Sequence, residues 1–166
     1  MKTLHKTLIA TACGLAMSAG AQAATVAFEY TNPDDFRDIR ATEQSQPKFE
    51  QNVLRELEAE FRDQAAKLPD GQTLHVTLKD VDLAGDIEYF HRAYPFGLRV
   101  IRDVDFPQME LSYELRDASG QVIKSGDDKI SDMSFHFPAF ASRVNADPLD
   151  YEKALIQQWV RETFSS

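Results

Sequence analysis

The chain has 166 residues, with 18 lysines and arginines against 27 aspartates and glutamates, and its formal net charge is −9. This acidic balance disfavours nucleic acid and anionic lipid as partners, because binding to either polyanion depends on a basic patch. It leaves protein partners, cationic ligands and metal ions open, and the length suits a single domain with one core.

The first 23 residues have the layout of a secretory signal peptide. A basic start ends at Lys6, an apolar stretch covers residues 8–17, and Ala21-Gln22-Ala23 supplies a small-x-small cleavage motif. We therefore predict cleavage after Ala23, export to the periplasm and a mature chain over residues 24–166. Loss of two lysines with the signal would leave 16 basic against 27 acidic residues, a net charge of −11.

Cys13 is the only cysteine and lies within the apolar part of the signal, so the mature chain can form no disulfide. Acylation of Cys13, as in a lipoprotein, is the disfavoured alternative, because Ala10-Thr11-Ala12 lacks the leucine usually expected before such a cysteine. The apolar stretch is shorter than the about 20 residues of a membrane span, and no later segment is long or apolar enough to be one. No transmembrane segment is expected.

The first half of the mature chain predicts strand, helix and strand. Residues 25–30 alternate with period two, and residues 34–46 are polar and aperiodic, which is typical of a surface connection. Apolar residues at three- and four-residue spacing predict a helix from Pro47 to Leu68. Residues 72–83 alternate again, with a slip of phase after Lys79 that indicates a β-bulge.

The second half predicts further strands and a closing helix. Residues 98–105 and 108–116 alternate, and Pro107 either bends one long strand or separates two short ones. A hairpin turn at residues 117–120 leads into a return strand over residues 121–133. Asp147-Pro148 provides an N-cap and first-turn pair for the last helix.

The order strand, helix, three strands, helix predicts a single α+β domain. We expect a four-stranded, mainly antiparallel sheet with both helices on one face, since a half-apolar sheet and two amphipathic helices bury each other. The other face of the sheet is expected to be polar, with His75, Thr77, Glu110 and Glu114 on it.

Four pieces of the chain together resemble a family of small secreted bacterial proteins catalogued as domain of unknown function 3016. They are the turn at residues 68–74, Asp82-Leu83-Ala84-Gly85, the segment from Arg102 to Tyr113, and residues 147–155. The resemblance covers essentially the whole mature chain and rests on turns, caps and strand patterns. It brings no activity with it and leaves the function to the individual residues.

Two loops, at residues 86–97 and 134–146, are unusually aromatic, and each contains a proline and a histidine. The candidate partner-binding residues are Tyr89, Phe90, His91, Arg92, Tyr94, Phe96, Phe135, His136 and Phe137. Exposed together, they would form a patch for a protein, peptide or lipid-like partner. Folded inward, they would close the ends of the core, and of the two arrangements this is the one that the sequence favours.

Asp80, Asp82, Asp86 and Glu88 surround Gly85 and are a candidate site for a hard divalent cation. Their spacing does not match the twelve-residue calcium loop, and a solvated strand end explains them as well.

His75, His91 and His136 are the histidines of the mature chain, and none forms an i, i+4 pair. A Gly-x-Ser-x-Gly motif and a phosphate-binding glycine loop are both missing, and nothing indicates a cofactor. We therefore expect a non-catalytic binding or accessory protein, with an envelope protein or peptide as partner and Arg99 beside the aromatic loops. The alternative is a metal-dependent or hydrolytic enzyme of the periplasm that uses these histidines with nearby carboxylates.

Overall fold

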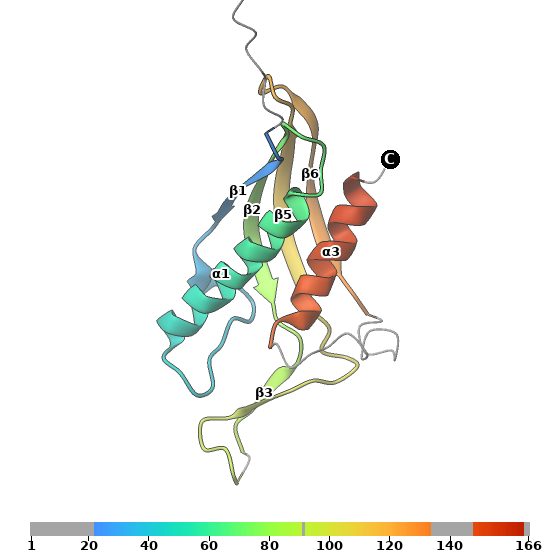
Figure 1. Ribbon diagram of the computed structural model, residues 1–166. Coiled ribbons are helices and arrows are strands. Elements are labelled where there is room, and N and C mark those ends of the chain that lie inside the picture. The colour runs from blue at the N-terminus through green and yellow to red at the C-terminus, as the bar shows by residue number, and fades with distance from the viewer. Residues whose placement is uncertain (1–21, 91, 134–147, 165–166) are drawn as a thin grey trace, which may run out of the picture.

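The computed structural model describes residues 22–90, 92–133 and 148–164 (Figure 1). Its elements in chain order are β1 (Thr25–Tyr30), the 3-10 helix η1 (Pro33–Asp35), α1 (Gln46–Ala65), β2 (Thr73–Asp82), β3 (Asp86–Glu88), β4 (Leu98–Val100), β5 (Gln108–Arg116), β6 (Val122–Ser131) and α3 (Asp150–Phe164). No helix in these described ranges combines the length and the apolar character that crossing a bilayer requires.

The main sheet has four strands in the order β1-β2-β5-β6. β2 pairs antiparallel with β5, and β5 with β6, whereas β1 pairs parallel with β2. The predicted α+β class is confirmed, and the sheet is mixed because α1 connects β1 to β2 as a crossover, which permits parallel pairing. The β2–β5 register shifts between Leu78 and Asp80, where the bulge was expected.

Both helices cover one face of the sheet (Figure 1). The strands turn alternate residues toward them, so that Leu74, Val76 and Leu78 on β2 are at most 1% exposed. Phe61 of α1 contacts Trp159 of α3 edge to face, with ring centroids 5.9 Å apart, and Trp159 packs in the same way on Tyr113 of β5. Burial of these rings supplies much of the stability of the core.

Two sequence-based expectations need correction. The connection over residues 34–46 is not wholly at the surface, since Phe36, Asp38 and Ile39 are buried. Asp38 also forms an isolated parallel bridge with Asp82 at the end of β2. The segment 98–105 is a strand only over β4, and Pro107 separates β4 from β5 into two different sheets. A proline lacks the N–H that a continuous strand would need there.

Candidate interaction surface

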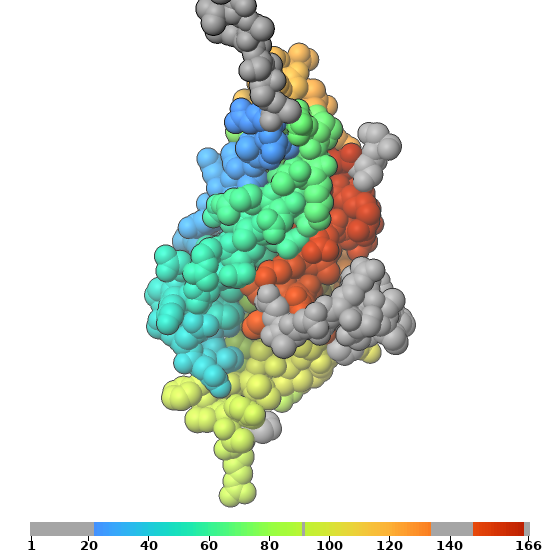
Figure 2. Space-filling model, in the orientation of Figure 1, coloured from blue at the N-terminus to red at the C-terminus, as the bar shows by residue number. Residues whose placement is uncertain are grey.

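A short hairpin extends from the end of the main sheet and carries the first aromatic loop. β3 and β4 pair antiparallel as a two-stranded sheet of their own, with Ile87 opposite Arg99. Figure 2 shows this hairpin as a narrow projection beyond the body of the protein. Residues 86–100 are called the arm below.

The aromatic side chains of the arm point into solvent. Phe90 is fully exposed at 103%, Phe96 is 69% exposed, Tyr89 52% and Tyr94 39%. The inward arrangement that the sequence favoured is therefore wrong for this loop. A loop at the end of a two-stranded sheet has no layer above it to cover its rings, whereas the same rings over the main sheet would face a helix.

The remaining candidates of the two aromatic loops divide between described and undescribed parts of the chain. Arg92 is exposed on the arm. His91, Phe135, His136 and Phe137 lie outside the described residues.

Tight backbone geometry fixes both ends of the β3–β4 ladder, at Gly85 before β3 and at Gly97 before β4. Gly85 has φ +80°, and a Cβ at that position would lie 2.6 Å from the carbonyl oxygen of Val100. Gly97 has φ +91°, and its Cβ would lie 2.7 Å from Ile87. Only glycine combines this backbone conformation with so close an approach. Ile87 itself is 6% exposed and packs against Gly97 within the arm.

An ion pair between distant segments ties β4 to the body. The Nη1 of Arg99 donates to Oδ2 of Asp38 at 2.8 Å and to the carbonyl oxygen of Gly85 at 2.9 Å. The side chain of Asp38 is 6% exposed and that of Arg99 is 19% exposed. Burial would raise the pKa of Asp38, but hydrogen bonds and charge from Arg99 and Arg40 outweigh it and lower the pKa below its ordinary value.

Arg37 holds two of the four carboxylates proposed as cation ligands. Its guanidinium lies 3.0 Å from Asp80 and 3.1 Å from Asp82, and its backbone N–H donates to Asp80 at 2.7 Å. Burial raises the pKa of Asp82, because the contact with Arg37 compensates only part of the desolvation. Asp38 and Asp82 are thus partners in a backbone β-bridge, yet the pKa of Asp38 is lowered and that of Asp82 is raised.

The other two carboxylates lie on β3, and each faces an arginine. Asp86 is 3.8 Å from Arg40, and Glu88 pairs with Arg102. Within the described ranges, no group of three or more histidine, cysteine, aspartate or glutamate residues is placed so as to hold a metal ion. Cation binding by Asp80, Asp82, Asp86 and Glu88 stays a prediction.

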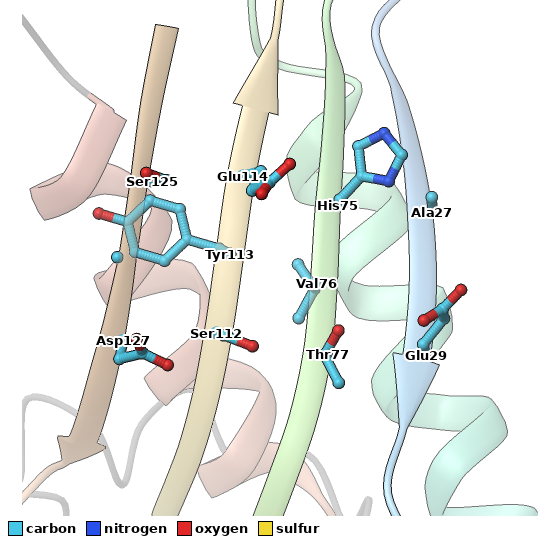
Figure 3. Close-up of a pocket in the computed structure, with 11 residues that line it drawn as sticks. Ala27, Glu29, His75, Val76, Thr77, Ser112, Tyr113, Glu114, Ser125 and Asp127 are labelled. Atoms are coloured by element: carbon cyan, nitrogen blue, oxygen red, sulfur yellow. The ribbon is translucent and has the colours of Figure 1, made fainter. Parts of the chain in front are cut away.

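The uncovered face of the main sheet is polar, as expected, and carries a shallow hollow of about 430 Å³. Figure 3 views this face with the helices behind the sheet, and shows Glu29, His75 and Glu114 on three neighbouring strands. His75 is paired with Glu114 across β2 and β5. Glu114 is held by Arg116 at 3.1 Å, so it does not stand free beside His75. Since His91 and His136 lie outside the described residues, convergence of histidines stays untested.

The pair formed by Asp38 and Arg99 is the feature that sequence reasoning missed. Asp38 lies in a segment without periodicity, and Arg99 is 61 residues away. A buried carboxylate is recognisable only through its partner, and no local pattern connects these two positions.

Comparison with known proteins places the chain in a family. The family model described as Protein of unknown function (DUF3016) matches residues 24–162. The chain belongs to this family. The match confirms the resemblance found in the sequence, and it spans every strand of the described residues and most of α3. No curated protein and no solved structure matches the chain.

Proposed function

We propose that this protein is a secreted, non-catalytic binding or accessory protein of the bacterial envelope, and that the arm is its contact surface. The observation that carries the proposal is the exposure of four aromatic side chains on one projecting hairpin. Aromatic residues and arginine are the residue types that contribute most to binding at interfaces. Exposing them to water without a partner is unfavourable, since each fully buried ring is worth about 1.5–3 kcal/mol.

The anchoring of the arm supports this role. Asp38, Gly85 and Arg99 hold the base of the arm in one geometry, so the base has little conformational entropy left to lose on binding. The predicted signal peptide supports export, and the family match begins at Ala24, the first residue after the predicted cleavage site.

Site-specific photo-crosslinking in intact cells tests the proposal. A photoreactive phenylalanine analogue replaces Phe90, and a matched chain carries it at Ile123, which is 48% exposed on β6. We expect adducts with envelope components, whether protein or lipid, at position 90 and none at position 123. Equal labelling at both positions, or no adduct of either kind at position 90, would show that the arm is not a contact surface.

A further inference from the structure

The composition of the arm separates it from the rest of the surface. From Tyr89 to Arg102 the chain has no acidic residue, although the whole chain carries 27 of them. The same stretch contains Arg92, Arg99 and Arg102. The arm tip is therefore aromatic and cationic, and it projects from an otherwise acidic protein.

The ion pairs at the base involve two of the three arginines between Tyr89 and Arg102. Arg99 pairs with Asp38, and Arg102 pairs with Glu88 and lies 3.5 Å from Asp105. Asp86, the other carboxylate of β3, faces Arg40. Within the described residues Arg92 makes no ion pair, and it is exposed, two positions from Phe90 and from Tyr94 in the sequence.

Building on the proposed function, we propose that the arm tip inserts into the headgroup region of an anionic lipid surface. Tyrosine and phenylalanine rings beside an arginine suit the interface between water and hydrocarbon, where the ring is buried and the charge meets lipid phosphates. The partner chemistry is thus a phosphate-bearing lipid headgroup above an apolar layer.

The shape of the tip favours lipid over a protein pocket. The tip is convex and Phe90 is fully exposed, so a protein partner would need a cavity that matches this ring. A fluid lipid interface can surround the ring without such a cavity. The charge of the body sets the orientation. At physiological salt the Debye length is about 8 Å, so acidic groups farther than this from the membrane are largely screened. The net charge of the whole chain disfavours anionic lipid, whereas the only charged residues in the stretch from Tyr89 to Arg102 are basic.

Vesicle binding of the chain from residue 24 to 166 tests the inference. Co-sedimentation is measured with phosphatidylcholine vesicles and with vesicles containing one quarter phosphatidylglycerol. The double variant Phe90→Ser/Phe96→Ser is expected to lower the partition coefficient on anionic vesicles by about tenfold or more, since two rings no longer leave water. The matched control Val122→Ser/Ile123→Ser alters two exposed apolar residues at the start of β6, where Val122 pairs with Arg116 at the end of β5 away from the arm, and it is expected to bind like the unmodified chain. Figure 1 shows β6 and the arm.

The charge contribution is tested separately. Arg92→Gln is expected to weaken binding to anionic vesicles by about fivefold, corresponding to about 1 kcal/mol per basic residue near the surface, and to leave binding to neutral vesicles unchanged. In Phe90→Trp the new indole should shift its emission to shorter wavelength on vesicle addition. Trp159, the only natural tryptophan, is 4% exposed, so its emission should stay constant.

Three results would overturn the lipid inference. They are no binding of the unmodified chain to either vesicle, equal binding by Phe90→Ser/Phe96→Ser, and an equal loss in the β6 control. Protein adducts at position 90 in the crosslinking experiment, combined with no vesicle binding, would keep the arm as a contact surface and assign it a protein partner. Absence of any adduct there would remove the proposed function itself.

Discussion

Replacement of Asp38 by asparagine tests whether the buried ion pair holds the arm to the body. Asparagine keeps the size of the side chain but removes the charge that faces Arg99. Breaking a buried ion pair costs about 3–5 kcal/mol because one charge is left without its partner. We expect a loss near the lower limit, about 3 kcal/mol, since the side chain of Arg99 is 19% exposed and retains some hydration.

Asp82→Asn is the matched control. Asp82 forms the bridge to Asp38 and contacts Arg37 at 3.1 Å, but Arg37 is 42% exposed. Burial raises the pKa of Asp82, so its ionised form opposes folding, and removal of that charge offsets the lost contact. The change in unfolding free energy should stay within about 1 kcal/mol, as for exposed pairs.

The two variants should also differ in their dependence on pH. The folded-state pKa of Asp38 is lowered, so its stabilisation is fully present above the unfolded pKa of about 3.9 and is lost as pH falls through the folded pKa. The deficit of Asp38→Asn relative to the unmodified chain should therefore shrink below about pH 4. Asp82 has a raised pKa, so acidification through that pKa should instead stabilise the unmodified chain relative to Asp82→Asn.

Urea unfolding followed by the fluorescence of Trp159 measures both effects. This tryptophan lies in the core, where its Nε1 donates to Asp128 at 2.8 Å, so its emission reports on global unfolding. A loss of less than about 1 kcal/mol for Asp38→Asn, well below the range for breaking a buried pair, would refute the reasoning. An equal loss in Asp82→Asn would refute it too, because the two aspartates would then be energetically equivalent.

Further predictions concern the arm and the core. Gly85→Ala should destabilise the arm by about 2 kcal/mol or more, because a Cβ would lie 2.6 Å from a backbone oxygen, and hydrogen exchange of β3 amides measures this. Gly120 has φ +84°, but no atom would lie within 4 Å of a Cβ added there. Gly120→Ala should therefore lower the free energy of unfolding in urea by only about 1 kcal/mol. Trp159→Phe should lower the free energy of unfolding by about 2 kcal/mol, because Asp128 loses its hydrogen-bond donor and the core loses buried ring area. Guanidinium unfolding followed by circular dichroism measures this loss. Phe90→Ser should leave the thermal midpoint unchanged, because that ring is fully exposed.

Local periodicity was sufficient for most of the secondary structure. Period-two alternation predicted β1, β2 and β5, the hairpin turn at residues 117–120 predicted β6, and three- and four-residue spacing predicted α1. The slip of phase after Lys79 even located the bulge in β2. These features are readable because a strand or helix exposes one face repeatedly, and the sequence records which face is apolar.

The candidate site depended on contacts that no local pattern contains. The exposure of the rings at residues 89–96 depends on which other segments pack over them. The local sequence is compatible with either a covered or an exposed arrangement. Likewise, the arm projects because β3 and β4 pair with each other instead of extending the main sheet.

By itself, then, the sequence determined the α+β class, the polar outer face of the sheet and the apolar stripes of both helices. Only the tertiary structure decided that β1 runs parallel to β2, that Asp38 meets Arg99, and that the arm presents its aromatic residues to solvent. The physical reason is that side-chain alternation specifies a face, whereas pairing, burial of charge and exposure of a loop depend on segments far apart in the chain.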